Sequence, residues 1–420
     1  MSEPDASILI VGAGQAAART AHALRSQGYA GSIVMVGAES HAPYERPPLS
    51  KAVLVDDVEP ALHVLTEEQF AACEIQFLSG VRALQLDTRA KSVHLDDGRH
   101  LRYGRCLLAT GGRVRELSGL EQGAPCTHYM RSLDDARKLR GVLAEGTQLA
   151  IIGGGFLGLE VAWSALRRGA RVTVIESAPG LLGRFLPQEL SDWLSASLRS
   201  EGVRLELGGS VRAARSSHEG VEIELGTGEV IRADQVLVAI GLVPEVDLAK
   251  AAGLRLDKEN GGILVDADGR SSDPDVFAAG DCASQFNFHL DRSARIESWQ
   301  NANEQGEAAA AGLLGKAPGK QAFPWFWTDQ GRHNVQMLGL SAPDLVYIRR
   351  GDLNEAKALW IGHRDGMPVH AIALNAGGDL RALRPLLEER VSFDPDEFEA
   401  GILPLRAWVK STMASHSPRT

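Results

Sequence analysis

Cysteines, aromatic residues and long apolar runs are all scarce in this sequence. Its 420 residues include four cysteines, and aromatic residues make up 5% of the chain. No two cysteines form a C-x-x-C pair, which argues against a dithiol relay or a cysteine-held metal cluster and favours reduced core thiols. No run of about 18 apolar residues occurs, so we predict no membrane span. The first apolar segment follows no basic leader, which argues against a signal peptide and favours a cytoplasmic location.

Basic residues are also outnumbered by acidic ones. Lys and Arg together number 44 against 54 Asp and Glu, which gives a formal net charge of −10. A general nucleic-acid-binding protein presents a basic surface, so we expect no nucleic-acid partner. The composition, with 44% hydrophobic and 23% charged residues, is that of a globular protein. The length predicts roughly three domains.

Two glycine-rich turns each join an apolar strand to a helix. They lie in ILIVGAGQAAARTAHAL near the start of the chain and in IIGGGFLGLE further on. Backbone N–H groups and the helix dipole at such a turn bind a pyrophosphate, so the two turns predict two dinucleotide sites. The small residues at the motif spacing are Gly12, Gly14 and Ala17 in the first turn and Gly153, Gly155 and Gly158 in the second.

An acidic residue follows the next strand after each turn. These residues are Glu39 and Glu176, whose carboxylates can accept hydrogen bonds from ribose hydroxyls. Glu176 would also repel the 2′-phosphate of NADPH, and Ser177 and Ala178 after it supply no cation. We therefore expect NADH rather than NADPH at the second site.

The two halves of the chain share one plan, in which a βαβ unit is followed by a β-meander and a final strand that ends in glycine. This plan predicts two related α/β domains built on parallel sheets. A long helix is expected over WQNANEQGEAAAAGLLG, and the change of composition at KAPGKQAFPW predicts a boundary. From Phe323 to about Val409 the pattern alternates like an antiparallel sheet and closes with one short helix.

Two further carboxylates stand near these motifs. Asp281, in VFAAGDCA, follows a strand and a glycine, where it could contact a hydroxylated chain or instead cap a helix. Glu160 lies just inside the second helix, where it could serve the site or simply be favoured by the helix dipole. The residues alone leave both alternatives open.

Six segments together carry a family resemblance. They are PYERPPLSK, LLATGG, GGGFLGLEVA, VFAAGDCA, RIESWQNANEQ and PWFWTDQG. In this order they resemble the oxygenase-coupled NADH-dependent ferredoxin reductases, a family that includes the reductases of aromatic-ring dioxygenases. The similarity covers the chain from about Ile8 to Val409.

The resemblance implies a glutathione-reductase-like α/β fold, in which two Rossmann-type dinucleotide-binding domains precede an α+β C-terminal interface domain. We therefore expect an FAD-binding domain from residues 1–112 and 242–320 and an NAD-binding domain from residues 113–241. A C-terminal domain from residues 321–410 and a flexible tail from residues 411–420 would follow.

The resemblance also implies roles for individual residues. Lys51 would lie near the flavin and Glu160 would face it across the nicotinamide pocket, so we expect these two to be the catalytic residues. No metal site is expected. The expected cofactor contacts are Gly12, Gly14, Ala16, Glu39, Arg46, Lys51, Val81, Ala109, Thr110, Gly111, Arg131, Asp281, Trp299, Trp327, Gly153, Gly155, Gly158, Glu160, Glu176 and Gly241.

The implied activity is electron transfer. A tightly bound FAD would accept electrons from NADH and pass them one at a time to a two-iron two-sulfur ferredoxin of the plant/vertebrate or Rieske type. That ferredoxin would feed a monooxygenase or a ring-hydroxylating dioxygenase, and the reductase would be a monomer or a weak dimer. The alternatives are a rubredoxin reductase and a redox interaction protein like the apoptosis-inducing factors.

Two details remain from the sequence. Thr328 stands where the family usually has Ser, and Glu245 stands where it usually has Asn, which leaves any contact by the Glu245 side chain open. An acidic ferredoxin would need a local basic patch on a chain of negative net charge. We expect that patch to be drawn from Arg292, Arg295, Arg332 and His333.

Overall fold

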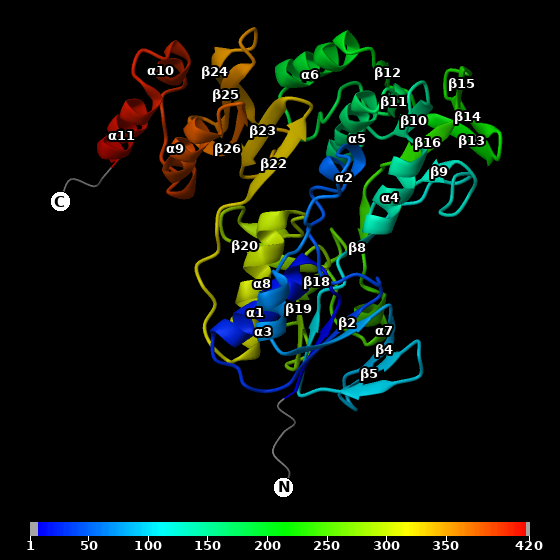
Figure 1. Cartoon of the computed structure of the whole chain (residues 1–420). Helices are drawn as coiled ribbons and strands as arrows, with labels where there is room; N and C mark the ends of the chain where they lie inside the picture. Colours follow the sequence, from blue (N-terminus) through cyan, green and yellow to red (C-terminus); the bar gives the residue numbers. More distant parts are fainter. Residues whose placement is uncertain (1–6, 417–420) are drawn as a thin grey trace. The chain divides into compact units, whose positions relative to one another are not determined.

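The computed structural model describes residues 7–416, which form two compact units (Figure 1). Unit 1 comprises the chain up to Pro48 together with Ala61–Arg113 and Leu242–Ala322. Unit 2 comprises Leu49–Pro60, Val114–Gly241 and the chain from Phe323 onward. Each unit is described separately below.

Unit 1 is built on a parallel five-stranded sheet. Its strand order is β19-β7-β1-β2-β3, and every pairing in it is parallel. The strands are rich in Val, Ile and Leu because both faces of such a sheet are covered. Their bounds are β1 (Ile8–Val11), β2 (Ile33–Gly37), β3 (Ile75–Ser79), β7 (Arg105–Leu108) and β19 (Val276–Ala278).

Two helices of unit 1 pack closely together, α1 (Gln15–Ser26) and α8 (Trp299–Leu313). The Thr20 hydroxyl donates to the carbonyl of Gly306 at 3.0 Å, and a Cβ on Gly306 would lie 2.8 Å from the carbonyl oxygen of Ala16. Glycine at this crossing therefore lets the two helices approach each other.

Smaller elements complete unit 1. An antiparallel sheet is formed by β4 (Ala83–Asp87), β5 (Ser92–Leu95) and β6 (His100–Arg102), and a second small sheet by β18 (Ile263–Val265), β20 (Ala283–Asn287) and β21 (Arg292–Ala294). The remaining elements are helices α3 (Glu67–Ala72) and α7 (Asp247–Ala251) and strands β8 (Gly112–Val114) and β17 (Leu242–Pro244), where the chain leaves and re-enters the unit.

Unit 2 repeats the parallel plan in the order β12-β11-β10-β16-β9. The strands are β9 (Thr127–His128), β10 (Gln148–Ile152), β11 (Arg171–Glu176), β12 (Arg204–Leu207) and β16 (Gln235–Val238). The meander is β13 (Val211–Ser217), β14 (Gly220–Leu225) and β15 (Val230–Ala233). The helices are α2 (Ala52–Val55), α4 (Leu133–Val142), α5 (Phe156–Arg167) and α6 (Gln188–Ser200).

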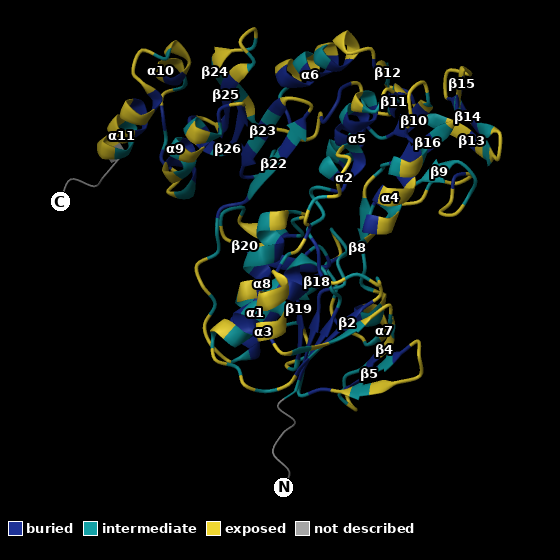
Figure 2. Ribbon diagram, viewed as in Figure 1, coloured by how far each residue is buried: buried dark blue, intermediate teal, exposed yellow. Residues whose placement is uncertain are grey.

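The C-terminal part of unit 2 is the predicted antiparallel sheet, in the order β22-β23-β26-β25-β24. Its strand bounds are β22 (Trp325–Gln330), β23 (His333–Leu338), β24 (Val346–Asp352), β25 (Lys357–Arg364) and β26 (Met367–Leu374). The inner strands β25 and β26 are mostly buried (Figure 2).

The end of the chain differs from the sequence-based expectation of one short helix and a tail. Three helices follow the sheet, α9 (Gly377–Glu388), α10 (Pro395–Ala400) and α11 (Leu405–His416). Helix α11 includes residues 411–416 of the expected tail, because buried Trp408 and Val409 anchor it to the core and Met413 packs against the same cluster. Residues 417–420 lie outside the described part. Within residues 7–416, no helix has the length and apolarity that crossing a membrane would require.

Candidate functional site

The first glycine turn, in unit 1, fits a closely approaching ligand. Gly12 has φ +115°, and a Cβ there would lie 2.1 Å from the carbonyl oxygen of Ala109, so only glycine is accommodated. Gly14 is the N-cap of α1, and a Cβ on it would meet nothing within 4 Å. The first backbone N–H groups of a helix have no partner within the helix, so this turn offers both donors and space to a pyrophosphate. Ala16 is buried in the core beneath this turn.

Glu39 follows β2 and is held by two neighbours in the same unit. Its carboxylate accepts hydrogen bonds from the Tyr44 hydroxyl at 2.5 Å and from Nη2 of Arg46 at 2.7 Å. Burial disfavours the charged guanidinium, but Tyr44 and Glu39 outweigh this, and the pKa of Arg46 rises above its usual value. The amide of Val81 donates to the carbonyl of Gly37 at 2.9 Å. The Glu39–Arg46 contact was not foreseen from the sequence.

The segment after β7 is tied to the start of α7. The Thr110 hydroxyl donates to the Glu245 carbonyl at 2.5 Å, and the Glu245 amide donates to the Gly111 carbonyl at 2.9 Å. The Glu245 carboxylate lies 3.3 Å from Nη1 of Arg113. The side chain that departs from the family pattern therefore forms an ion pair within unit 1.

Asp281 follows β19 and precedes β20, so its alternative reading as a helix cap is wrong. The cap of α8 is Ser298, whose hydroxyl accepts from the Asn301 amide at 3.1 Å. Trp299, the first residue of α8, donates from Nε1 to the Glu45 carboxylate at 3.3 Å and is 37% exposed.

The second glycine turn, in unit 2, repeats the geometry of the first. Gly153 has φ +112°, and its Cβ would lie 2.3 Å from the Ala239 carbonyl oxygen. A Cβ on Gly158 would lie 2.1 Å from the Gly153 carbonyl oxygen, while one on Gly155, the N-cap of α5, would meet nothing. Gly241 has φ +102° and is equally open.

Glu176, at the end of β11, is fixed by backbone amides. One carboxylate oxygen accepts from Gly154 N at 2.7 Å and the other from Ala178 N at 2.7 Å, with the Ser177 hydroxyl also donating at 3.2 Å. The carboxylate is thereby oriented beside the glycine turn, where a ribose would lie.

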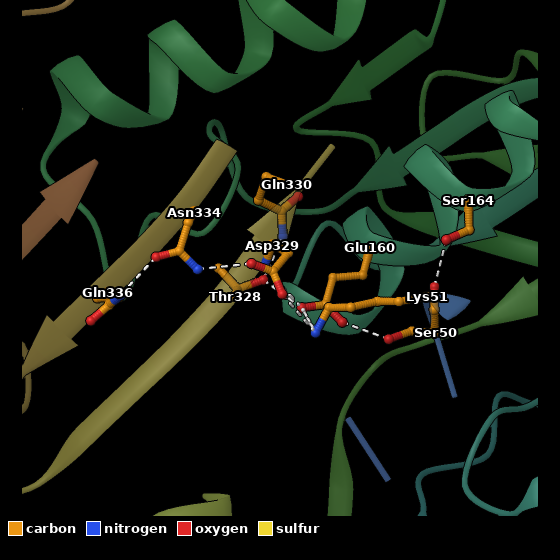
Figure 3. A network of polar contacts seen from close by, with 9 residues as sticks. All are labelled: Ser50, Lys51, Glu160, Ser164, Thr328, Asp329, Gln330, Asn334 and Gln336. Atoms are coloured by element: carbon orange, nitrogen blue, oxygen red, sulfur yellow. Dashed lines mark hydrogen bonds and ion pairs between the residues drawn. The ribbon is translucent and has the colours of Figure 1, made fainter. Parts of the chain in front are cut away.

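Lys51 and Glu160 meet inside unit 2 (Figure 3). Nζ of Lys51 lies 3.1 Å from Oε1 of Glu160 and 3.4 Å from Oδ2 of Asp329. Glu160 is only 8% exposed. We call Lys51, Glu160 and Asp329 the Lys51 cluster. It contains one cation and two carboxylates.

Neutral donors hold Glu160 in place (Figure 3). The Ser50 hydroxyl donates to Oε2 at 2.5 Å, and the Thr328 hydroxyl donates to Oε1 at 2.7 Å. The Asp329 amide reaches Oε1 at 3.4 Å, and the Ser164 hydroxyl donates to the Ser50 carbonyl at 2.6 Å. This arrangement, and the position of Glu160 beyond the first turn of α5, disfavour the alternative in which it is an incidental acid favoured by the helix dipole.

Asp329, Ser50 and Ser164 were not predicted as site residues from the sequence. Asp329 lies within PWFWTDQG, but nothing in that segment shows that Lys51 is its neighbour. Thr328, noted only as a departure from the family pattern, proves to be a direct donor to Glu160. A hydroxyl is all that this contact needs, so Ser or Thr can make it.

Trp327 and Arg131, which were expected to contact the cofactor, each interact with a neighbouring residue. Trp327, in β22, stacks on Trp325 with ring centroids 5.0 Å apart. Arg131 immediately precedes the N-cap of α4, and its amide donates to the Asp135 carboxylate at 3.1 Å.

Only two of the four residues expected to form the ferredoxin-docking patch are exposed. Arg292 and Arg332 are exposed, each in its own unit. Arg295 has a side chain 14% exposed that pairs with Glu297, and His333 is 6% exposed. Burial, followed by the nearby charge of Arg332, lowers the pKa of His333 below its usual value. The expectation is therefore wrong for Arg295 and His333, because packing and ion pairing occupy them.

All four cysteines are free thiols. Cys73, Cys106 and Cys282 are buried, and Cys126 is partly buried. Cys282, beside Asp281, is fully buried, and burial raises the pKa of its thiol. None of them is placed as an exposed, reactive thiolate.

Comparison with known proteins identifies related chains. The model of the pyridine nucleotide-disulphide oxidoreductase family matches residues 6–306, and that of the reductase C-terminal family matches residues 325–409. The ferredoxin--NAD(+) reductase component of the anthranilate 1,2-dioxygenase system of Burkholderia cepacia is 42% identical over 392 residues, covering 93% of this chain and 96% of the relative. That of the p-cumate 2,3-dioxygenase system of Pseudomonas putida is 36% identical over 412 residues, covering 97% and 99%.

Solved structures extend the likeness to the fold. The reductase in the covalent putidaredoxin reductase–putidaredoxin complex matches with a TM-score of 0.92 and 34% identity, covering 97% of this chain and 99% of that one. A ferredoxin reductase from Rhodopseudomonas palustris matches with a TM-score of 0.90 and 32% identity, covering 96% and 99%. These matches confirm the predicted glutathione-reductase-like fold. The chain belongs to the pyridine nucleotide-disulphide oxidoreductase family and carries the reductase C-terminal domain.

Proposed function

We propose that the protein is an FAD-dependent NADH:ferredoxin reductase that supplies electrons to an oxygenase through a small iron–sulfur ferredoxin. The observation that carries this proposal is the Lys51–Glu160 contact, 3.1 Å long, beside the second nucleotide turn of a chain with no reactive cysteine pair. The similarity to ferredoxin reductases of dioxygenase systems supports it.

The residues of unit 1 fit FAD. The tight turn at Gly12 and the open N-terminus of α1 at Gly14 suit its pyrophosphate, and Glu39 suits its adenosine ribose. We infer that Asp281 and the Ala109–Gly111 segment line the rest of this site. The FAD-binding domain is proposed to comprise residues 1–112 and 242–320.

The residues of unit 2 fit NADH. Gly153, Gly155 and Gly158 provide the second pyrophosphate turn, and Glu176 is oriented toward the ribose position by two backbone amides. A carboxylate there disfavours a 2′-phosphate, so NADH is the preferred donor. The NAD-binding domain is proposed to comprise residues 113–241 and the interface domain residues 321–410.

The Lys51 cluster serves the nicotinamide end of that site. A carboxylate offers about four acceptor positions, and among the described residues the Ser50 hydroxyl donates to Oε2 of Glu160. That oxygen retains the capacity to accept from the carboxamide of a nicotinamide. Lys51 supplies a cation that stabilises negative charge developing beside it. FAD, when bound, accepts two electrons together and releases them singly, which matches NADH to a one-electron iron–sulfur acceptor.

The cysteines argue against a disulfide as the electron acceptor. Reduction of a disulfide substrate by such flavoproteins requires an accessible cysteine pair, and the four thiols here are free and largely buried. The electrons are therefore expected to leave for an external partner. We propose a two-iron two-sulfur ferredoxin of the plant/vertebrate or Rieske type, a cytoplasmic location, and a monomer or weak dimer.

Ferredoxin reduction by the purified holoprotein tests the proposal. The assay follows NADH-dependent reduction of a panel that contains plant/vertebrate-type ferredoxins, Rieske-type ferredoxins and a rubredoxin, with ferricyanide as an acceptor that needs no docking. Rapid reduction of at least one two-iron ferredoxin is expected. Reduction of rubredoxin alone, or of ferricyanide alone, would overturn the assignment of the partner, and failure of the protein to bind FAD would overturn the whole proposal.

A further inference from the structure

Asp329 is the second carboxylate of the Lys51 cluster and differs from Glu160 in its surroundings. Its side chain is 39% exposed, whereas that of Glu160 is 10% exposed. It lies on β22, the edge strand of the C-terminal sheet, between the buried residues Thr328 and Gln330. The edge strand thus presents a carboxylate to Lys51 in addition to the groups that hold Glu160.

The two carboxylates are fixed independently of each other. Glu160 accepts from the hydroxyls of Ser50 and Thr328 as well as from Lys51, so its position does not depend on the Asp329 side chain. Asp329 is fixed from the opposite side, where its Oδ1 accepts from Nδ2 of Asn334 at 2.8 Å. A change at the Asp329 side chain should therefore alter Lys51 while leaving Glu160 in place.

The support behind Asp329 follows from the strand register (Figure 3). Asp329 pairs with Asn334 across the β22–β23 ladder, and Trp327 pairs with Gln336. Side chains at paired positions share one face, so Asn334 and Gln336 lie in a row beside Asp329. Nε2 of Gln336 donates to Oδ1 of Asn334 at 2.8 Å. This chain of amides leaves Oδ2 of Asp329 directed at Lys51, 3.4 Å away.

The charges of the cluster do not cancel. Lys51 contributes +1 and the two carboxylates contribute −2, so the cluster carries a formal −1. The ring of oxidised nicotinamide carries +1 and the ring of the reduced form is neutral. A net negative cluster beside the ring favours the oxidised form over the reduced one, and partial neutralisation of Lys51 weakens its stabilisation of an anion.

We propose that Asp329 is a positioning residue that holds the Lys51 ammonium against Glu160 and, through its charge, sets how the site discriminates between cationic and neutral nicotinamide rings. This inference rests on the proposed function, because it assumes that the nicotinamide end of NADH reaches the Lys51 cluster. Through Asp329, the C-terminal sheet would therefore influence nicotinamide binding at the proposed NADH site of the same unit.

The affinities of the oxidised holoprotein for nicotinamide ligands test the inference without relying on turnover. Asp329→Asn keeps the size of the side chain and removes its charge. Affinity for NAD⁺ is expected to fall about threefold to tenfold, while affinity for tetrahydro-NAD, a neutral-ring analogue that cannot donate hydride, stays unchanged.

Two further variants complete the experiment. Glu355→Gln removes the same charge from an exposed position in the β24–β25 turn and should change neither quantity. Asp329→Glu retains the charge and should restore most of the NAD⁺ affinity. If Asp329→Asn loses affinity for NAD⁺ and for the neutral analogue equally, Asp329 serves only the shape of the site. If Asp329→Asn behaves like Glu355→Gln, Asp329 has no role in nicotinamide binding. Either result overturns the inference.

The same measurements separate this inference from the proposed function. If Lys51→Met and Glu160→Gln also leave the affinities for NAD⁺ and tetrahydro-NAD at the parent values, the assignment of the nicotinamide end to this cluster fails. If those two variants alter the affinity for NAD⁺ and Asp329→Asn does not, only the role of Asp329 is lost.

Discussion

The amide of Gly154 donates to the carboxylate of Glu176 at 2.7 Å, which joins the glycine turn directly to the end of β11. The carboxylate is held beside the turn before any ribose arrives, so little ordering is required on binding. In the proposed NADH site, the same contact would make Glu176 a fixed negative charge where NADPH would carry its 2′-phosphate.

Glu176→Gln should narrow the preference for NADH over NADPH by about tenfold, because removal of the charge removes its repulsion of the phosphate. The ratio of kcat/KM for the two donors, measured with ferricyanide as acceptor, checks this. The gain should come from faster use of NADPH. Equal rates for both donors in the parent protein would refute the role given to Glu176.

The first glycine turn offers a matched pair of substitutions. Gly12→Ala places a Cβ 2.1 Å from the Ala109 carbonyl oxygen at φ +115°, so the fold itself should be destabilised, by about 1–3 kcal/mol or more. Gly14→Ala meets nothing within 4 Å and should cost the apoprotein little, yet its methyl enters the space proposed for the pyrophosphate.

Thermal unfolding and bound flavin content distinguish the two variants. Gly12→Ala should lower the Tm with or without added FAD, whereas Gly14→Ala should keep the Tm of the apoprotein and lose FAD affinity. If Gly14→Ala binds FAD as tightly as the parent, the pyrophosphate does not lie at the N-terminus of α1.

Lys51→Met should slow flavin reduction by NADH by about tenfold or more, because a cation is removed from beside developing negative charge. Global stability should change by only about 1 kcal/mol, since Lys51 is partly exposed and Glu160 keeps its neutral donors. Stopped-flow flavin absorbance and thermal unfolding measure the two effects. A variant that loses stability but keeps the reduction rate would assign Lys51 to the fold instead.

His370, in the C-terminal sheet, makes stability depend on pH. Its ring is buried and Nδ1 lies 2.7 Å from the Tyr347 hydroxyl, and burial lowers its pKa from 6.5 to about 3. The unfolded chain therefore binds a proton below pH 6.5 that the folded chain does not. Stability is full above pH 6.5 and is lost as the pH falls toward 3, by about 2 kcal/mol at pH 5.

Comparison with His370→Gln isolates this contribution. The other histidines whose pKa is lowered act in the same direction, so the slope of unfolding free energy against pH, and not its absolute value, is the quantity to compare. Between pH 6.5 and 4.5 the variant should show a shallower slope, by about one proton. Identical slopes in the two proteins would show that His370 is not buried in its neutral form.

Local sequence patterns predicted the parallel sheets because each glycine turn follows a short apolar strand and opens a helix. They failed at the end of the chain, where one short helix and a tail were expected although three helices follow the sheet. Leu380, Leu383 and Leu387 line the buried face of the first of these helices, α9. Tertiary packing of that face overrides the local signals.

Contacts between segments that lie far apart in the sequence are the second feature that local patterns could not predict. Lys51 and Glu160 were expected together only because a family resemblance joined them, and Asp329 was missed. Its position opposite Asn334 depends on the β22–β23 register, and its distance from Lys51 depends on how the edge strand packs against α5. Neither relation leaves a periodic pattern in the sequence.

Ferredoxin docking should depend on the exposed arginines. Of the four residues expected to form the patch, Arg292 and Arg332 remain accessible, while Arg295 is paired with Glu297 and His333 is buried. Rim charges chiefly set the association rate and its salt dependence. Because the chain carries −10 overall, an acidic partner must be attracted by such local charges against the field of the whole protein.

Arg332→Ala and Arg292→Ala should each slow ferredoxin reduction about threefold to tenfold at low ionic strength and less at high salt. Arg89→Ala, which removes the same charge from the exposed β4–β5 turn, serves as the matched control and should have little effect. Ferricyanide reduction should be unchanged in all three variants, because this small acceptor needs no docking surface. A loss of ferricyanide activity would place the damage at the flavin. Unchanged ferredoxin rates in both test variants would mean that the partner docks elsewhere, and an effect confined to Arg332→Ala would assign docking to the C-terminal sheet, the element that also presents Asp329 to Lys51.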